Sequence, residues 1–256
     1  MKKSICCIAL ALVMALSTVG LFASCAKEKE KTLVMATNAN FPPYEYKDGA
    51  AFAGIDVELA QAIADKLGMK LEIQDVEFGA IVAGVESGKY DIGMAGMTVT
   101  EDRKKQVSFS TTYATGVQVV IVKEGSAIQS PADITTSSKI GVQQDTTGDL
   151  YASDTPEKGG WGEAAVTRYK NGADAVQALQ TGKLDCVIID KEPAKSFVAA
   201  NSGLKIQDTE YTNEDYAIAV GKSNTELLEK INKALDELKK DGTIDKIVGK
   251  YIPADK

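Results

Sequence analysis

The sequence of 256 residues contains no histidine. Histidine is the base of the Ser-His-Asp and Cys-His catalytic arrangements and the commonest metal ligand, so its absence excludes these nucleophiles and the usual zinc sites. Neither the phosphate-binding loop GxxxxGK[ST] nor the dinucleotide fingerprint GxGxxG occurs in the chain. We therefore expect no metal ion and no cofactor.

Cysteine is nearly as scarce. Only Cys186 lies beyond the first 25 positions, and it falls within the apolar run Leu184–Ile189. A lone cysteine in such a run behaves as a small buried hydrophobic residue. No intramolecular disulfide is expected, although an exported protein could carry one.

The N-terminus has the composition of a secretory signal. Two lysines precede the uncharged, largely apolar stretch Ile5–Phe22, and the small residues Ala23 and Ser24 follow. A basic start, an apolar centre and a small-residue cleavage site predict a signal peptide over residues 1–24. The alternative is a transmembrane anchor, for which a stretch of about 18 residues is barely long enough.

The cysteine at position 25 indicates that the exported protein is attached to a membrane. Phe22-Ala23-Ser24-Cys25 resembles a bacterial lipobox, whose cysteine becomes the lipid-modified first residue of the mature protein. Residues 25–31 would then be a lipidated N-terminus and a short solvated tether. The alternative is a chance cysteine beside an ordinary cleavage site. The resemblance implies a protein held by its lipid alone on the outer face of the cell membrane or in the periplasm.

Acidic residues outnumber basic ones. The chain has 36 Asp and Glu against 29 Lys and Arg, and loss of residues 1–24 removes two lysines and no acid, which takes the net charge from −7 to −9. Nucleic acids require a basic protein surface. We therefore expect no nucleic-acid partner.

Predicted strands and helices alternate along the chain, which indicates an α/β fold with largely parallel sheets. One unit occurs twice: an amphipathic helix, a Gly-Lys-x-Asp turn and an apolar strand, over residues 81–92 and again over 175–186. In this register Gly96 corresponds to Asp190, each at the carboxyl end of its strand. The repeat predicts two similar lobes; the alternative is that α/β proteins reuse such turns.

Polar loops follow the predicted strands at their carboxyl ends, where ligands bind in open α/β sheets. Asn38–Phe41 and Gly96–Arg103 lie at such ends in one lobe, and Gln143–Gly148 and Asp190 in the other. Two such edges facing each other would form a cleft. Asp56 is expected to cap the helix that it begins, and Thr100 to cap another. Between them we expect a helix over about Gly79–Ser87 and a buried strand over Tyr90–Ala95.

The same loops resemble the polar amino acid-binding proteins of ABC importers, which are extracellular solute-binding proteins of family 3. The resemblance extends over Thr32–Tyr251, and its strongest stretches are ATNANFPPYEY (36–46), GIDVELA (54–60), AGMTVTEDR (95–103), IGVQQDTTG (140–148) and VIID (187–190).

The resemblance implies a two-lobed periplasmic-binding-protein fold of type II, in which each lobe is a mostly parallel sheet flanked by helices. Two hinge strands would join the lobes. Lobe 1 would comprise residues 32–112 and 219–256, lobe 2 residues 118–213, and the hinge residues 113–117 and 214–218.

The resemblance also implies a function. The protein would be a monomer that captures a free polar amino acid between its lobes and delivers it to the transmembrane permease of an ABC importer. Two alternatives stay open. An exported, dehydratase-like enzyme could use the same scaffold, with Asp190 as its acid-base group. The chain could also be a ligand-sensing module, although no receptor or kinase segment follows Lys256.

Arg103 is the most informative candidate site residue. It is one of two arginines in the chain and lies in the first turn of a predicted helix, where the macrodipole disfavours a cation. A planar guanidinium fork suits bidentate contact with a carboxylate, which lysine cannot reproduce. In the family the matching arginine holds the ligand's α-carboxylate. The alternative is a surface ion pair with Glu101 or Asp102.

Further positions match the family's ligand contacts. Asp190 would pair with the α-ammonium, and Thr147 with Gly148 would offer the free N–H groups of a helix start to an anion. At the strand end, the ligand's two charged ends would be contacted by Gly96, Met97 and Thr98. Aromatic rings would flank the ligand side chain, and these belong to Phe41 and Phe78. The candidates for recognising that side chain are Asn38, Glu45, Glu77, Gln143 and Gln144.

Each of these assignments has a structural alternative: a simple turn for Gly96 and Thr98, a helix cap for Asp190, and core packing for the two phenylalanines. Asp145 departs from the family, whose loop usually has glycine there, and this puts the loop geometry in question. No lysine or arginine falls at the side-chain positions. A basic amino acid or glutamine is therefore favoured over glutamate or aspartate.

Overall fold

A computed structural model describes residues 31–207 and 212–253 of the chain. The predicted signal peptide and Cys25 lie outside the described residues. The described residues belong to one compact unit. Among the described helices, none combines the length and the apolar character that a membrane span needs.

The first sheet has five strands. In spatial order they are β5 (Lys70–Asp75), β1 (Thr32–Thr37), β6 (Ile92–Gly93), β14 (Ala219–Gly221) and β7 (Val107–Phe109). β1 runs parallel to β5 and β6, as predicted, whereas β14 is antiparallel to both of its neighbours. A small second sheet follows β1 and leads into the first long helix; its strands are β2 (Asn40–Phe41), β3 (Glu45–Asp48) and β4 (Ala51–Ala53).

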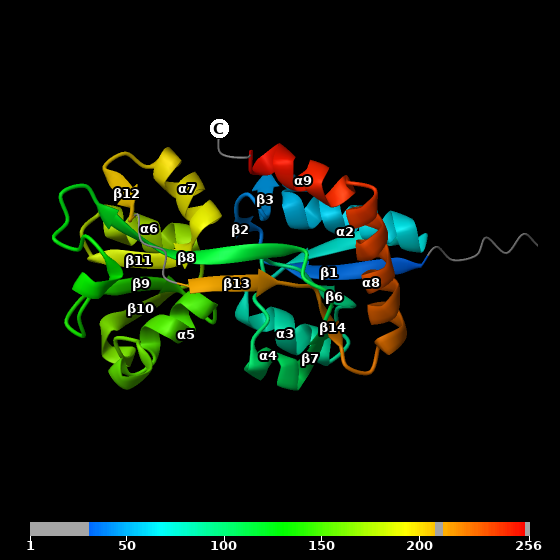
Figure 1. The fold of residues 1–256 in the computed structure, drawn as a ribbon, viewed down its shortest axis with the longest axis horizontal. Coiled ribbons are helices and arrows are strands. Elements are labelled where there is room, and N and C mark those ends of the chain that lie inside the picture. The colour runs from blue at the N-terminus through cyan, green and yellow to red at the C-terminus, as the bar shows by residue number, and fades with distance from the viewer. Residues whose placement is uncertain (1–30, 208–211, 254–256) are drawn as a thin grey trace, which may run out of the picture. The chain divides into compact units, whose positions relative to one another are not determined.

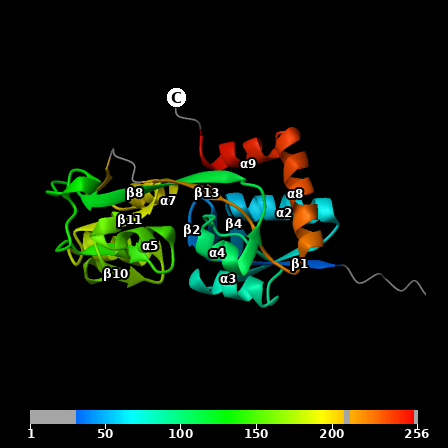
Figure 2. The same ribbon diagram turned by 60° about the horizontal axis from the view of Figure 1, so that its bottom comes forward.

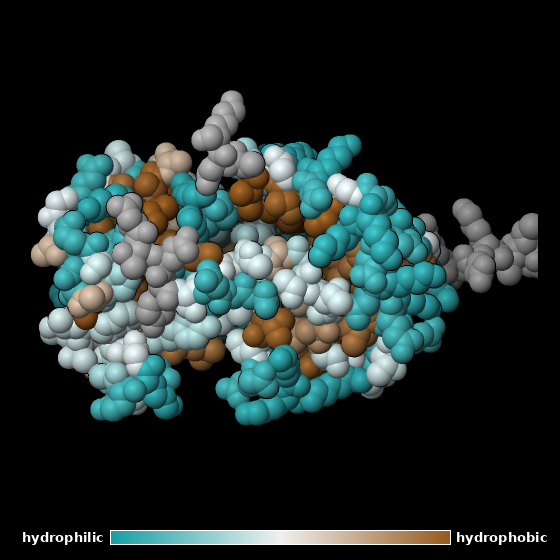
Figure 3. All heavy atoms as spheres, in the orientation of Figure 1, coloured by the Kyte–Doolittle hydropathy of each residue, from teal (hydrophilic) through white to brown (hydrophobic). Residues whose placement is uncertain are grey.

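Helices cover the first sheet on two sides (Figure 1). Their bounds are α2 (Ile55–Leu67), α3 (Gly79–Glu86), α4 (Glu101–Gln106), α8 (Thr225–Lys240) and α9 (Thr243–Tyr251). α2, α8 and α9 contact one another, and α3 packs on β1, β6 and β14 from the other side. The face seen in Figure 3 is mostly hydrophilic over α8.

The third sheet is formed mainly by the middle of the chain. Its strands, in order, are β10 (Val166–Tyr169), β9 (Ile140–Gln143), β11 (Cys186–Asp190), β8 (Ala114–Lys123) and β12 (Leu204–Ile206), and β13 (Thr212–Tyr216) pairs with β8. β9 runs parallel to β10 and β11, and β8 is antiparallel to β11, β12 and β13. The helices of this part are α5 (Thr147–Ser153), α6 (Gly172–Gln180) and α7 (Lys191–Ala200), with short 3₁₀ turns at Pro131–Asp133, Pro156–Lys158 and Glu163–Ala165.

The chain passes twice between the first and the third sheet. β7 leads into β8, and β13 leads into β14. β8 and β13 pair from Ala114 with Tyr216 to Gln118 with Thr212, and Figures 1 and 2 both show them side by side. Both copies of the repeated sequence unit form a helix followed by a strand, namely α3 with β6 and α6 with β11. The predicted fold class is confirmed, with antiparallel strands added where the chain crosses between the sheets.

Two predictions about single residues, Cys186 and Asp56, can be compared with the structure. Cys186 is a free, fully buried cysteine, as expected. The prediction that Asp56 caps α2 is wrong, because Gly54 occupies the cap position with φ 121°, and a Cβ there would overlap the Tyr44 carbonyl. Asp56 instead lies in the first turn of the helix with a fully buried side chain.

Candidate functional site

A small cavity lies where residues from the first and the third sheet meet. The lining residues are Asn38, Phe41, Glu45, Phe78, Ala95, Gly96, Thr98, Arg103, Gln143, Thr146, Thr147 and Asp190. Several of these are polar side chains that are almost fully buried, which is costly without a hydrogen-bond partner.

Arg103 lies in α4, whose first turn is capped by the Thr100 side chain, as predicted. Its Nη1 donates to the Thr98 carbonyl at 2.7 Å and its Nη2 to the Asp145 carbonyl at 3.1 Å. The guanidinium lies 5.2 Å from the centre of the Phe78 ring, a cation–π contact. Because burial removes the guanidinium from water, the pKa of Arg103 is lowered from its usual value.

The surface ion pair considered as an alternative for Arg103 is excluded. Glu101 pairs with Lys104 and Asp102 with Lys105, all on the exposed side of α4. Within the described residues no carboxylate lies at ion-pair distance from Arg103, which has two carbonyl partners instead. A buried, oriented guanidinium of this kind is suited to binding a carboxylate.

Gly96 and Thr98 belong to the loop after β6. Gly96 has a φ of 50°, and a Cβ there would come within 2.9 Å of Phe41 Cε1, so the loop requires glycine. Its N–H donates to Asp56 Oδ2 at 2.8 Å. Thr98 Oγ1 donates to Glu214 Oε2 at 2.9 Å and lies 3.4 Å from Thr147 Oγ1, which comes from the third sheet's side of the cavity.

Asp190 ends β11 at the cavity. Its side chain makes no cap hydrogen bond to α7, which excludes the helix-cap alternative, and it accepts from the Tyr216 hydroxyl. Burial, with a further contribution from nearby Glu214, raises the pKa of Asp190 to about 7. A cation beside Asp190 would reverse this effect and favour its carboxylate.

The loop between β9 and α5 contains the departure from the family pattern. Asp145 has a φ of 64°, the left-handed conformation that glycine adopts without strain. Its N–H donates to Asp149 Oδ2 at 3.0 Å while its carbonyl accepts from Arg103. Asp145 therefore takes the conformation that glycine would take, and α5 begins at Thr147 as predicted.

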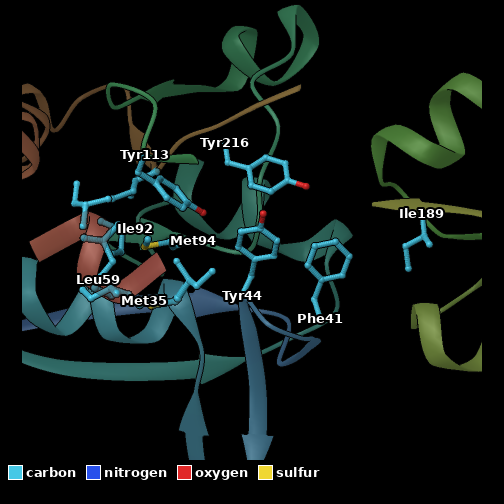
Figure 4. Packing of buried hydrophobic residues seen from close by; sticks show 14 of the residues in the cluster. Met35, Phe41, Tyr44, Leu59, Ile92, Met94, Tyr113, Ile189 and Tyr216 are labelled. Carbon is cyan, nitrogen blue, oxygen red and sulfur yellow. The ribbon is translucent and has the colours of Figure 1, made fainter. Parts of the chain in front are cut away.

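Phe41 lines the cavity and belongs to a group of three aromatic rings that extends behind it. The rings of Phe41 and Tyr44 are stacked, with centres 6.0 Å apart, and Tyr44 meets Tyr216 edge to face at 5.2 Å. Figure 4 shows these three rings on the side of the core cluster that faces Ile189, the residue before Asp190.

A comparison with protein families gives one match that covers nearly the whole described chain. The model of the bacterial extracellular solute-binding proteins, family 3, matches residues 33–254. The chain belongs to this family.

Individual members of the family and their neighbours agree with this assignment. The arginine-binding extracellular protein ArtP of Bacillus subtilis (strain 168) is 33% identical over 252 residues, which cover 97% of each chain. A structure of an ancestral arginine-binding protein bound to arginine superimposes with a TM-score of 0.80 at 42% identity, covering 87% of this chain and 99% of that one. An ancestral amino acid-binding protein described as a precursor of cyclohexadienyl dehydratase gives a TM-score of 0.78 at 34% identity, covering 86% and 95%.

Most of the ligand contacts predicted for this family 3 protein lie around the cavity. Those that line it are Asn38, Phe41, Phe78, Gly96, Thr98, Arg103, Gln143, Thr147 and Asp190. Met97 and Gly148 do not: the Met97 side chain is fully buried in a hydrophobic cluster, and Gly148 lies behind Thr147 against Gln118 and Ile188. That these residues contact a ligand stays a prediction.

The residues considered for reading the ligand side chain divide in two. Glu45 lines the cavity, and Gln143 Nε2 donates to Asn38 Oδ1 at 3.0 Å beside it. Glu77 instead pairs with Lys170 in an exposed ion pair, and Gln144 is exposed and does not line the cavity.

Sequence reasoning missed the residues immediately behind the cavity wall. Asp56, Glu214, Tyr113 and Tyr216 are all buried, and each bonds a loop or side chain of the site or another member of this group. Asp56 lies within GIDVELA (54–60), one of the stretches that carry the family resemblance, and this was the available signal. Nothing local to Glu214 or Tyr216 marks them, since both reach the site through the pairing of β13 with β8.

Proposed function

We propose that this protein binds a free amino acid with a cationic side chain, of the arginine type, in the cavity between its first and third sheets. It then delivers the ligand to the transmembrane permease of an ABC importer. The observation that carries the ligand class is the surplus of buried acids. Glu45, Asp56, Asp190 and Glu214 are buried at or behind the cavity, whereas Arg103 is the only basic residue among the lining residues described.

The two charged ends of an amino acid use only part of this set. The α-carboxylate binds the Arg103 fork, with the Thr98 hydroxyl and the start of α5 beside it. The α-ammonium pairs with Asp190. The positive charge of the ammonium lowers the raised pKa of this carboxyl and so favours its anionic form. Glu45 is then left for the ligand side chain, and a carboxyl there favours a cation over a neutral or acidic group. The names of the relatives, which bind arginine, support the same class.

Delivery depends on movement between two lobes with the boundaries expected from the sequence. Lobe 1 comprises residues 32–112 and 219–256, and lobe 2 comprises residues 118–213. Residues 113–117 and 214–218, which lie in or next to the crossing strands β8 and β13, act as the hinge. The permease recognises the closed arrangement, and the protein acts as a monomer.

The N-terminal part of the proposal concerns location. Residues 1–24 are removed as a signal peptide, and Cys25 carries the lipid that retains the protein at the outer face of the cell membrane or in the periplasm. The family, which is described as extracellular, supports export. Cys25→Ser should move the protein from the membrane fraction to the soluble fraction, and a wild-type protein found wholly in the soluble fraction would contradict the anchor.

An enzyme on this scaffold is the second candidate, because a neighbour is described as the precursor of a dehydratase. Such an enzyme needs an acid-base group aimed at its substrate. Asp190 already accepts from Tyr216 and is assigned to the α-ammonium, so we propose that the protein is not an enzyme. Incubation with candidate amino acids and cyclohexadienyl acids, followed by product analysis, would reveal turnover if this is wrong.

A thermal-shift screen against the twenty amino acids tests the ligand class. A ligand that binds only the folded state raises the melting temperature, with stabilisation of about 4 kcal/mol at a thousandfold excess over its Kd. Arginine and lysine should give the largest shifts and glutamate and aspartate none. A shift with glutamine alone, or with none of the basic amino acids, would overturn the proposal.

A further inference from the structure

Two carboxyl groups meet behind the cavity. Glu45 in β3 is 1% exposed and Asp56 in α2 is fully buried. The Asp56 N–H donates to the carbonyl of Tyr44, the residue before Glu45, at 2.9 Å, and each of the two neighbouring carboxyls shifts the pKa of the other. Glu45 Oε2 and Asp56 Oδ1 are both buried, and the described residues give neither of them a hydrogen-bond partner. Two carboxylates have only acceptor oxygens, so these two oxygens can satisfy each other only if one carboxyl keeps its proton.

The surroundings decide which carboxyl holds the proton. Asp56 Oδ2 accepts from the Gly96 N–H and from the Tyr113 hydroxyl, each at 2.8 Å, and both bonds favour its anionic form. Burial nevertheless raises the pKa of Asp56 to about 6. The pKa of Glu45 is raised well above its usual range by burial first and then by the neighbouring Asp56. Glu45 is therefore the acid of the pair and Asp56 the carboxylate.

The groups around this pair come from several elements. Asp190 in β11 raises the pKa of Glu45, and Tyr113, just before β8, donates to Asp56 and lowers its pKa. The pair in turn raises the pKa of Tyr44, just before β3. Arg103 in α4 lines the same cavity as Glu45, but its guanidinium bonds to the Thr98 and Asp145 carbonyls. Within the described residues no lysine or arginine contributes to the pKa of either carboxyl. The pair thus lacks a cation, and Glu45 is the member that lines the cavity.

We propose that Glu45 and Asp56 share one proton in the ligand-free protein, and that a cationic ligand side chain displaces this proton to solvent when it enters the cavity. The inference rests on the proposed function and adds a proton exchange to it. Before binding, the pair carries one negative charge. After binding, both carboxylates are ionised and the ligand's guanidinium or ammonium supplies the compensating charge beside Glu45. The proton leaves to the buffer, so one proton is exchanged for one cation.

This exchange makes the affinity for a cationic ligand depend on pH. Because binding releases a proton, lowering the pH opposes binding, by up to about tenfold in affinity per pH unit while the pair stays protonated. Asp190 also loses a proton to the buffer when any α-ammonium binds beside it, since its pKa is raised to about 7. The contribution of the pair must therefore be measured as a difference between a cationic and a neutral ligand of the same shape.

Calorimetry with L-arginine and L-citrulline provides this difference, because citrulline replaces the guanidinium by a neutral urea group. The binding heat of the wild-type protein is measured near pH 7 in phosphate and in Tris, whose ionisation enthalpies differ, which yields the number of protons released. Arginine should release about one proton more than citrulline. Arginine should also lose affinity more steeply than citrulline as the pH falls from about 7.5 to 6.

Glu45→Gln tests the assignment to this carboxyl. An amide is isosteric with the protonated acid and still donates to Asp56, but it cannot ionise. The variant should bind arginine at least about tenfold more weakly, release no extra proton and bind citrulline as the wild type does. The matched control is Glu124→Gln, which makes the same charge change at an exposed position and should alter none of these values. Where citrulline binds too weakly for calorimetry, wild type and Glu45→Gln are compared with arginine alone.

The possible failures are distinguishable. If arginine binds tightly but releases no more protons than citrulline, or if Glu45→Gln releases as many protons as the wild type, the shared proton is refuted while the ligand class stands. If arginine does not bind at all, the proposed function fails and this inference fails with it. The wild-type comparison needs no variant, so a folding defect in Glu45→Gln cannot obscure the result.

Discussion

At the scale of single residues, Arg103 is a buried cation whose partners are carbonyl groups. The Thr98 and Asp145 carbonyls and the Phe78 ring fix the plane of its guanidinium. These contacts come from both sides of the cavity, because Asp145 belongs to the loop after β9 and Thr98 to the loop after β6. An orientation fixed in this way lowers the entropy cost of binding a carboxylate.

Arg103→Lys should weaken arginine binding by about ten- to a hundredfold while leaving the fold intact. A lysine ammonium cannot bridge two carboxylate oxygens, and the loss of a charge-assisted hydrogen bond costs about 1.5–3 kcal/mol. Titration calorimetry measures the change. Lys105→Arg is the control, since it exchanges the same two side chains in the opposite direction within the exposed ion pair with Asp102 on α4. Equal affinity of wild type and Arg103→Lys would remove Arg103 from the site.

Single residues were predictable from the sequence where their chemistry was unusual. Arg103 was selected because arginine is rare in this chain and because the position matches a family motif. Asp56 was misassigned as a cap, because its burial depends on the turn at Gly54 and on the approach of Gly96, which no local pattern encodes. Glu45 could not be ranked above the other candidates for recognising the ligand side chain, because the burial of its neighbour Asp56 was not recognised.

At the scale of elements, the crossing strands also form part of the site. Tyr216 in β13 is fully buried and donates to Asp190 at the end of β11. It can do so because β8 has a glycine at position 116, where a Cβ would lie 2.6 Å from Tyr216 Cε1 and would overlap the hydroxyl group. The absence of a side chain at Gly116 in one crossing strand thus allows Tyr216 of the other to position Asp190.

Gly116→Ala should therefore weaken ligand binding without contacting the ligand. The added methyl group displaces the Tyr216 ring, Asp190 loses its donor, and overpacking of this kind costs about 1–3 kcal/mol of folding stability. We expect at least about tenfold lower affinity, measured by calorimetry beside urea denaturation. In Gly249→Ala the same change is made in α9 with no atom within 4 Å, and stability should hold or rise by up to about 1 kcal/mol. Unchanged affinity of Gly116→Ala would show that Tyr216 does not position Asp190.

The elements themselves followed the sequence closely where periodicity and capping are local. α3 ends one residue before the predicted Ser87, and Thr100 caps α4 as expected. The strand predicted over residues 90–95 is confined to Ile92–Gly93, because the chain leaves the sheet there and enters the loop that contains Gly96, whose φ is positive. The antiparallel pairing of β8 with β12 and β13 joins segments far apart in sequence, so only the family resemblance could suggest it.

At the scale of the whole molecule, a few polar contacts join the two sides of the cavity. Thr98 meets Thr147, Arg103 meets the Asp145 carbonyl, Asn38 meets Gln143, and Glu77 pairs with Lys170 at the exposed rim. Hydrogen bonds contribute about 0.5–1.5 kcal/mol each, and exposed ion pairs contribute less. This sum is small enough for a ligand that bonds to both sides to shift the balance between open and closed arrangements.

Small-angle X-ray scattering should therefore show a lower radius of gyration with saturating arginine than without it. In the proposed function Arg103 holds the ligand's carboxylate on one side and Asp190 its ammonium on the other, so both ends would be satisfied only when the lobes close. Asp190→Ala removes the anionic partner on the side of the third sheet, and it should show little compaction at an arginine concentration that closes the wild type. A radius that stays constant on binding would argue against closure about β8 and β13. If Asp190→Ala closes and binds like the wild type, the ammonium is held from the other lobe alone, and Glu45 becomes the remaining acid that can hold it there.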